Sequence, residues 1–147
     1  RQPLQHAQPG FLHHIFSHGA ARHIHHRQAQ QLRVVAFDQR HKGGFVASTQ
    51  CRKQSGHYFA SANLPKSAVE IDGAQHLTWF RSSEKVQRGF CSRCGSWLFW
   101  EPVFRDWTSV ALGSLDGPTG LQLERHIFVS EKGDYYTIAD GLPQNER

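Results

Sequence analysis

Residues 90–96 (FCSRCGS) constrain the fold of this chain more than any other segment. They place two thiols, Cys91 and Cys94, at C-x-x-C spacing between two apolar runs. Two thiols at this spacing can bind one Zn²⁺ from a single tight turn. Gly95 suits such a turn because glycine tolerates the positive φ that the backbone needs beside the metal. The segment therefore predicts a hairpin that carries half of a four-coordinate zinc site.

The rest of the chain does not supply an obvious second half. The sequence contains three cysteines, so Cys51 is the only one left beyond the pair. An odd number of cysteines, two of them in a C-x-x-C motif, argues against a disulfide framework and favours a reducing, cytoplasmic setting. The sequence thus predicts a metal-binding turn with an incomplete set of ligands.

Downstream of Cys51 the pattern predicts a mainly β domain built from short antiparallel strands. Short β-prone runs recur about every ten residues and are separated by Gly, Pro and Asp, without long helical periodicity. The expected strands are residues 57–62, 69–71, 77–80, 86–90, 97–100, 107–112, 125–129 and 135–138. The length of 147 residues suits one domain, and no apolar run reaches the roughly 18 residues that a membrane span needs.

Residues 1–48 have a different composition and no clear strand pattern apart from residues 32–37. The first 50 residues carry six basic side chains against the single acid Asp38 and hold eight of the 11 histidines, whereas residues 51–147 are charge-neutral. Three interpretations remain open. The segment is a metal-loading histidine tract, a transit-like or nucleic-acid-binding basic arm, or a stretch translated out of frame or from a rearranged gene.

Several segments together resemble one known family. Residues 49–61, 88–96, 113–116, 126–129 and 138–144 are similar to the glutathione-dependent formaldehyde-activating and centromere-protein-V family, in family order and spacing. The resemblance covers residues 49–147 and implies a zinc-binding β fold of the Mss4-like type. It also implies a carbon–sulfur lyase-type reaction, in which glutathione adds to formaldehyde and gives S-(hydroxymethyl)glutathione or a related thiol adduct.

The family pattern contains more cysteines than this chain. An early C-x-C and the later C-x-x-C hold a structural zinc, and a C-x-C-x-x-C holds a catalytic zinc. Cys91 and Cys94 match the later pair, and Cys51 matches the last cysteine of the triple. The first two positions of the triple fall on Val46 and Ser48, and the early C-x-C has no counterpart. The resemblance therefore predicts a zinc enzyme with an incomplete ligand set and impaired catalysis.

Each candidate site residue has a functional and a structural interpretation. Cys51 is a catalytic zinc ligand or a buried thiol without a metal; Cys91 and Cys94 are zinc thiolates or a reduced pair in a hairpin. Arg52 and Lys53 bind the carboxylates of a small-molecule substrate such as glutathione, or they form a solvated basic pair. A histidine from the N-terminal segment could complete the set around Cys91 and Cys94.

Other residues are expected to be structural. His57 and His126 are interpreted as structural histidines, and the four tryptophans (Trp79, Trp97, Trp100 and Trp107) as core residues. The neutral charge of residues 51–147 argues against strong nucleic-acid binding there. The alternative to an enzyme is a non-enzymatic β scaffold whose basic N-terminal arm binds a partner or nucleic acid.

Overall fold

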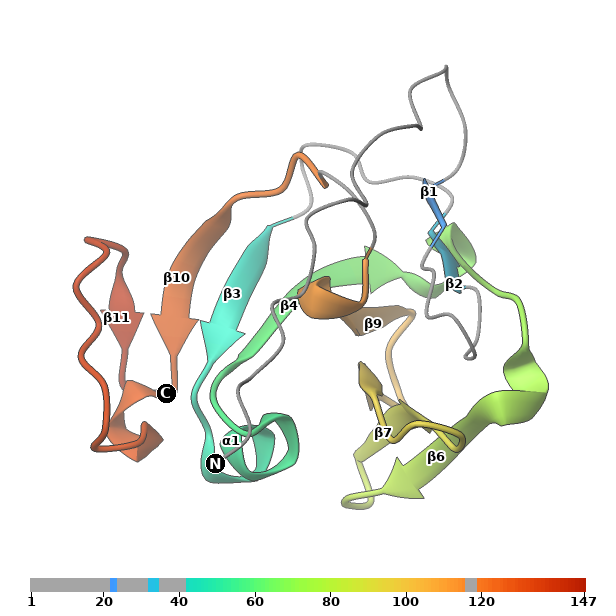
Figure 1. The fold of residues 1–147 in the computed structure, drawn as a ribbon, viewed down its shortest axis with the longest axis horizontal. Helices are drawn as coiled ribbons and strands as arrows, with labels where there is room; N and C mark the ends of the chain where they lie inside the picture. The colour runs from blue at the N-terminus through green and yellow to red at the C-terminus, as the bar shows by residue number, and fades with distance from the viewer. Residues whose placement is uncertain (1–21, 24–31, 35–41, 116–118) are drawn as a thin grey trace, which may run out of the picture.

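The computed structural model describes residues 22–23, 32–34, 42–115 and 119–147, and its architecture is mainly β (Figure 1). This confirms the fold class expected from the sequence. The strands are β1 (Arg22–His23), β2 (Leu32–Val34), β3 (Gly43–Val46), β4 (Phe59–Pro65), β5 (Val69–Ile71), β6 (Leu77–Arg81), β7 (Val86–Cys91), β8 (Trp97–Pro102), β9 (Trp107–Ala111), β10 (Leu123–Ile127) and β11 (Gln144–Asn145). The helical elements are α1 (Thr49–Ser55) and four 3₁₀ turns, η1 (Lys66–Ala68), η2 (Ala74–His76), η3 (Leu112–Ser114) and η4 (Val129–Glu131).

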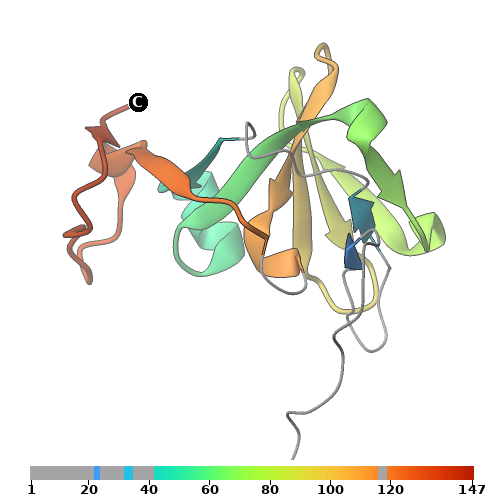
Figure 2. The ribbon, with the colours of Figure 1, turned by 90° about the horizontal axis from the view of Figure 1, so that it is seen from above.

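Eight strands form one curved sheet in the order β11-β10-β3-β4-β9-β8-β7-β6. The six strands from β3 to β6 pair antiparallel with their neighbours, as expected, whereas β10 runs parallel to both β3 and β11. In Figures 1 and 2, β10 and β11 lie at one side of the molecule, and β6 and β7 lie at the other. A separate three-stranded sheet has the order β1-β2-β5.

Most strands lie where the sequence predicts them, but one prediction is wrong. Residues 135–138 form a turn and a loop, and the strand near the C-terminus is instead Gln144–Asn145. The aromatic side chains of this segment, Tyr135 and Tyr136, pack against each other and against His57 and do not alternate across a sheet. The Tyr136 ring lies 4.3 Å from the ring of His57, and Lys132 Nζ donates a hydrogen bond to the Tyr136 carbonyl.

The predicted boundary after residue 48 remains a prediction, because most of residues 1–48 lie outside the described part. The described strand β3 precedes that boundary and nevertheless belongs to the main sheet. It pairs with β4 from Gly43↔Ala62 to Val46↔Phe59, and with β10 on its other side. Helix α1 follows β3 directly; the sequence did not predict it, because seven residues are too few to show helical periodicity.

The main core lies on one face of the sheet. Its fully buried members are Leu64, Val110, Phe99 and Cys91, at 0–1% exposure, with Leu98 beside them. Along β4, Ala62 and Leu64 are buried on this face, while Phe59, Ser61 and Asn63 point to the other face, as the period of two requires.

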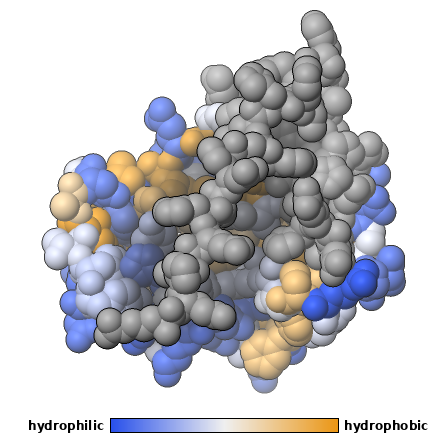
Figure 3. Space-filling model, viewed as in Figure 1, coloured by the Kyte–Doolittle hydropathy of each residue, from blue (hydrophilic) through white to orange (hydrophobic). Residues whose placement is uncertain are grey.

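Trp79 does not belong to the core, contrary to the expectation for the four tryptophans. It is 37% exposed and its neighbour Phe80 is 48% exposed, because β6 is the edge strand of the sheet. Figure 3 shows hydrophobic residues at the surface of this face both at the upper left and at the bottom of the view. Trp97, Trp100 and Trp107 are half-buried. Among the described residues, no helix has the length and apolar character needed to cross a membrane.

His126 ties the C-terminal segment to the sheet, in agreement with its interpretation as a packed residue. His126 is 5% exposed, and its ring stacks on Phe45 with ring centroids 4.6 Å apart. His126 Nε2 lies 2.8 Å from the Asp140 carboxylate, and its backbone N–H donates to the Pro143 carbonyl. The hydrogen bond with His126 lowers the pKa of Asp140 below its ordinary value.

Gly89 gives a test of the packing around β7. A Cβ at this position would lie 2.9 Å from Phe99 and 3.1 Å from both Leu77 and Trp79. Gly89→Ala is therefore expected to destabilise the fold by about 1–3 kcal/mol through overpacking. Urea unfolding measures the change. Gly113→Ala is the matched control, because a Cβ there meets no atom within 4 Å; equal stability losses in both variants would contradict the packing argument.

The Asp140–His126 pair gives a pH test. Because the folded-state pKa of Asp140 is lowered, its contribution to stability is present above the ordinary pKa of about 3.9 and is lost as pH falls through the lowered value. Asp140→Asn should therefore be less stable than the wild type at neutral pH, and the difference should shrink below about pH 4. Unfolding midpoints across this range measure it. Substitution of the exposed Asp134 by Asn is the control, and a difference that persists unchanged at low pH would refute the assignment.

Candidate functional site

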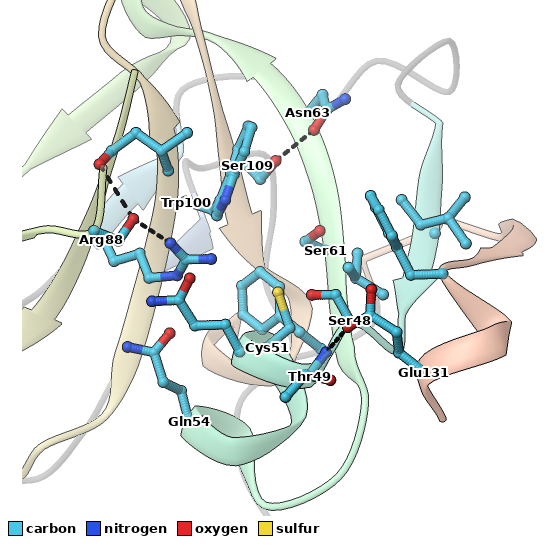
Figure 4. Close-up of a pocket in the computed structure, with 18 of the residues that line it drawn as sticks. Ser48, Thr49, Cys51, Gln54, Ser61, Asn63, Arg88, Trp100, Ser109 and Glu131 are labelled. Carbon is cyan, nitrogen blue, oxygen red and sulfur yellow. Dashed lines mark hydrogen bonds between the residues drawn. The ribbon is translucent and has the colours of Figure 1, made fainter. Parts of the chain in front are cut away.

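A pocket of about 1050 Å³ opens on the face of the sheet opposite the main core. Helix α1 forms one side of it, and strands β3, β4, β7, β8, β9 and β10 contribute side chains to its walls (Figure 4). The wall also contains residues that were not expected in a site from the sequence, namely Ser61 and Asn63 on β4, Trp100 on β8, and Ser109 on β9. Ser109 Oγ donates a 2.6 Å hydrogen bond to Asn63 Oδ1, which fixes this polar part of the wall.

Cys51 lies in this pocket. It is on the first turn of α1, is 3% exposed, and packs with Phe59 and Ala111. Val46 and Ser48, the two positions where the family pattern has the other cysteines of its triple, line the same pocket. The structure therefore brings the three positions together, but only Cys51 carries a sulfur. Valine offers no donor atom for a metal, and a serine hydroxyl does not replace a thiolate.

The N-terminus of α1 is held by the 3₁₀ turn η4. The Thr49 backbone N–H donates a 2.6 Å hydrogen bond to Glu131 Oε2. This hydrogen bond is the main reason that the pKa of Glu131 lies below its ordinary value. Arg52 Nε donates a hydrogen bond to the Glu131 carbonyl at 2.9 Å. Two hydrogen bonds to Glu131, from Thr49 and from Arg52, therefore hold α1 against η4.

The two basic residues after Cys51 have different surroundings. Lys53 is exposed and lines the pocket near Cys51. Arg52 is half-buried, and its guanidinium is directed to η4. Arg52 does not belong to the described residues that line the pocket. Substrate binding by Lys53 and by Arg52 remains a prediction, and the position of Lys53 is the better suited of the two.

Sequence reasoning did not single out Arg88 as a site residue. Arg88 is on β7, is 5% exposed, and lines the pocket of Cys51. Its Nη1 donates a hydrogen bond to Ser82 Oγ, whereas its Nε is buried and has no hydrogen-bond partner. One sequence feature points to Arg88: it lies two residues after Val86 in a predicted strand, so both side chains face the same side of the sheet. Arginine is seldom buried, so the strand pattern alone does not predict a buried arginine at this position.

The C-x-x-C turn has the predicted form. The Cys91 N–H donates to the Ser96 carbonyl at 2.9 Å, the Gly95 N–H donates to the Cys91 carbonyl at 2.8 Å, and Gly95 has φ 76°. Cys91 is buried and Cys94 is exposed. The Cys94 thiol hydrogen-bonds the Ser96 hydroxyl at 3.2 Å, and this contact is the largest cause of its lowered pKa. The pair lines a second pocket of about 500 Å³.

Neither pocket contains a complete donor set for zinc within the described part of the chain. A structural zinc needs four ligands, and a catalytic zinc usually has three protein ligands. No group of three or more His, Cys, Asp or Glu side chains that could hold a metal is found in the described residues. All three cysteines are free thiols, and Cys51 lines a different pocket from Cys91 and Cys94. A histidine ligand from the N-terminal segment stays a prediction, because the side chains of residues 1–41 lie outside the described part of the chain.

Comparisons with known proteins identify the family. The sequence profile of the family described as "Glutathione-dependent formaldehyde-activating enzyme" matches residues 31–131, so the chain belongs to this family. At the level of the family, this membership supports a function of the formaldehyde-activating type. No curated protein matches the chain.

A solved structure is similar in fold. It is the crystal structure of a Rhodobacter sphaeroides protein, with a TM-score of 0.55 and 18% sequence identity. The similarity covers 66% of this chain and 89% of that chain. At this identity the likeness concerns the fold alone.

The convergence of Val46, Ser48 and Cys51 on one pocket can be tested by adding the absent sulfurs. The double substitution V46C/S48C should raise the zinc bound per chain by about one equivalent over the wild type, because three thiolates can then share one ion. Metal analysis of purified protein, with Co²⁺ substitution to detect thiolate ligation, measures this. V46A/S48A is the matched control. An unchanged metal content in V46C/S48C would show that the three positions do not form one site.

Proposed function

We propose that this chain binds a glutathione-class thiol in the pocket of Cys51. We further propose that it carries out the carbon–sulfur lyase-type reaction of its family at a reduced rate. The observation that carries the proposal is the convergence of the three family ligand positions on one large pocket with a single sulfur among them. A pocket of about 1050 Å³ is large enough for a tripeptide.

The reaction joins a thiol and an aldehyde. The sulfur of the thiol forms a bond to the carbonyl carbon of formaldehyde, the carbonyl π bond breaks, and the thiol proton ends on the oxygen. The product is a hydroxymethyl thioether, and the reverse reaction is the lyase direction. A thiol reacts as its thiolate, so a catalyst must either favour the thiolate or hold both reactants together.

The residues of this chain are better suited to holding the two reactants together than to favouring the thiolate. Most of the exposed wall area of the pocket is apolar and can pack against the apolar parts of a ligand, and the basic side chains of the wall favour an anionic ligand. The zinc that the resemblance implies does not fit the described donors, so no step is assigned to it. The proposed reduced rate therefore comes from binding and orientation of the thiol and the aldehyde in a pocket without a completed metal site.

The alternative scaffold function depends on a basic arm within residues 1–48. Most of that segment lies outside the described residues, so no structural observation favours this alternative. The proposal therefore has a small molecule as the ligand of the described domain.

The proposed function is tested by two measurements on the same protein. Calorimetric titration with glutathione should detect binding, and exchange spectroscopy with ¹³C-formaldehyde should detect slow catalysed formation of S-(hydroxymethyl)glutathione. V46C/S48C loaded with zinc should be the faster catalyst. Absence of glutathione binding would refute the proposal. Zinc near two equivalents per wild-type chain, with a rate equal to that of V46C/S48C, would refute the claim of impairment.

A further inference from the structure

Arg88 is a buried cation that lacks a counter-charge among the described residues. None of the ion pairs formed within the described residues includes it, and its Nε has no hydrogen-bond partner. An arginine stays charged at any physiological pH, so burial cannot be relieved by losing the proton. A buried charge without a partner is costly, and folded proteins usually pair such groups.

The contacts that Arg88 does make are neutral. Nη1 donates to the hydroxyl of Ser82, and the Arg88 Cζ lies 5.7 Å from the centre of the Trp97 ring. A ring face favours a cation by about 0.5–2 kcal/mol, which does not replace an anion. A guanidinium has five N–H donors, and the guanidinium of Arg88 forms one hydrogen bond to another described residue, the one to Ser82. The group therefore retains donors for a ligand.

The other charged side chains around the pocket do not neutralise Arg88. Lys42, Lys53 and Arg125 add positive charge, and Lys42 and Arg125 lie 3.1 Å and 3.9 Å from Glu124, which is not part of the pocket wall. The acid on the wall, Glu131, is bound to the Thr49 N–H at the N-terminus of α1. The pocket wall thus has an excess of positive charge, and Arg88 is its most buried cation.

We infer that Arg88 binds a carboxylate of the ligand and positions that ligand in the pocket of Cys51. This rests on the proposed function and deepens it, because a glutathione-class tripeptide carries two carboxylates together with its thiol. Figure 4 shows Arg88 and Cys51 reaching into the same pocket from β7 and from α1. The carboxylate is held at one wall, and the rest of the ligand extends along the pocket toward the thiol of Cys51.

The first experiment changes Arg88. Arg88→Gln should weaken glutathione binding by about tenfold to a hundredfold, because a charge-assisted hydrogen bond to a desolvated group is lost. Arg88→Lys keeps the charge and should recover part of the affinity. Arg88→Met should unfold at least as late in urea as the wild type, since removal of an uncompensated charge offsets the lost contact with Ser82. A clear loss of stability in Arg88→Met, with unchanged glutathione affinity in Arg88→Gln, would show a purely structural role.

The second experiment changes the ligand and needs only the wild-type fold. Glutathione diethyl ester keeps the thiol but has no carboxylates, so it should bind the wild type and Arg88→Gln equally weakly. Equal affinities of the ester and of glutathione for the wild type would overturn the inference, while the proposed function would stand.

The third experiment separates failure of the inference from failure of the proposed function. Glutarate, a dicarboxylate without sulfur, should shift the Arg88 Nε–H resonance of the wild-type protein, and acetamide at the same concentration should not. If glutathione fails to bind but glutarate shifts this resonance, the proposed function is wrong and the carboxylate site remains. No shift with either glutarate or glutathione would overturn the inference.

Discussion

The alternation of side chains along β4 separates the core of this protein from its pocket. Ala62 and Leu64 are buried on one face, while Phe59, Ser61 and Asn63 face the pocket. Because the side chains of a strand alternate with a period of two, a shift of one residue would exchange these two sets. The register is fixed on both sides, by β3 from Gly43↔Ala62 and by β9 from Ser61↔Ala111. The site therefore depends on the same pairing that forms the core.

Much of this fold follows from local patterns. The strands from β5 to β9 lie on the predicted runs, and Gly95 takes the positive φ expected of it. The errors occur where the decisive contacts are distant in sequence. Residues 135–138 look like a strand, but Tyr136 packs on His57, nearly 80 residues away in the sequence, and none of the described strands pairs with this segment. Trp79 looks like a core residue, but its position on an edge strand is a property of the sheet order.

The candidate site was likewise predictable only where it depends on local sequence. Cys51 and Lys53 could be proposed from the motif that contains them, and both line the large pocket. Helix α1 could not be foreseen, since much of its stability comes from Glu131 and from packing of Cys51 on Phe59. Arg88 required knowledge of its burial, which depends on the curvature of a sheet whose strands come from the whole domain.

The positions of the family's cysteine triple and the proposed carboxylate site lie in different parts of the structure. Val46 and Ser48 lie at the end of β3 and in the connection to α1, where a change of side chain removes a donor without altering any strand pairing of β7. Arg88 lies inside β7, paired on both sides and next to Gly89, where added volume is not tolerated. Substitutions at Val46 and Ser48 leave the pairing of β7 in place, whereas those at Arg88 and Gly89 act on a strand inside the sheet. Under the proposed function, a chain with a single thiol at these three positions therefore keeps the pocket wall that contains Arg88, and we expect ligand binding to be separable from metal-dependent catalysis.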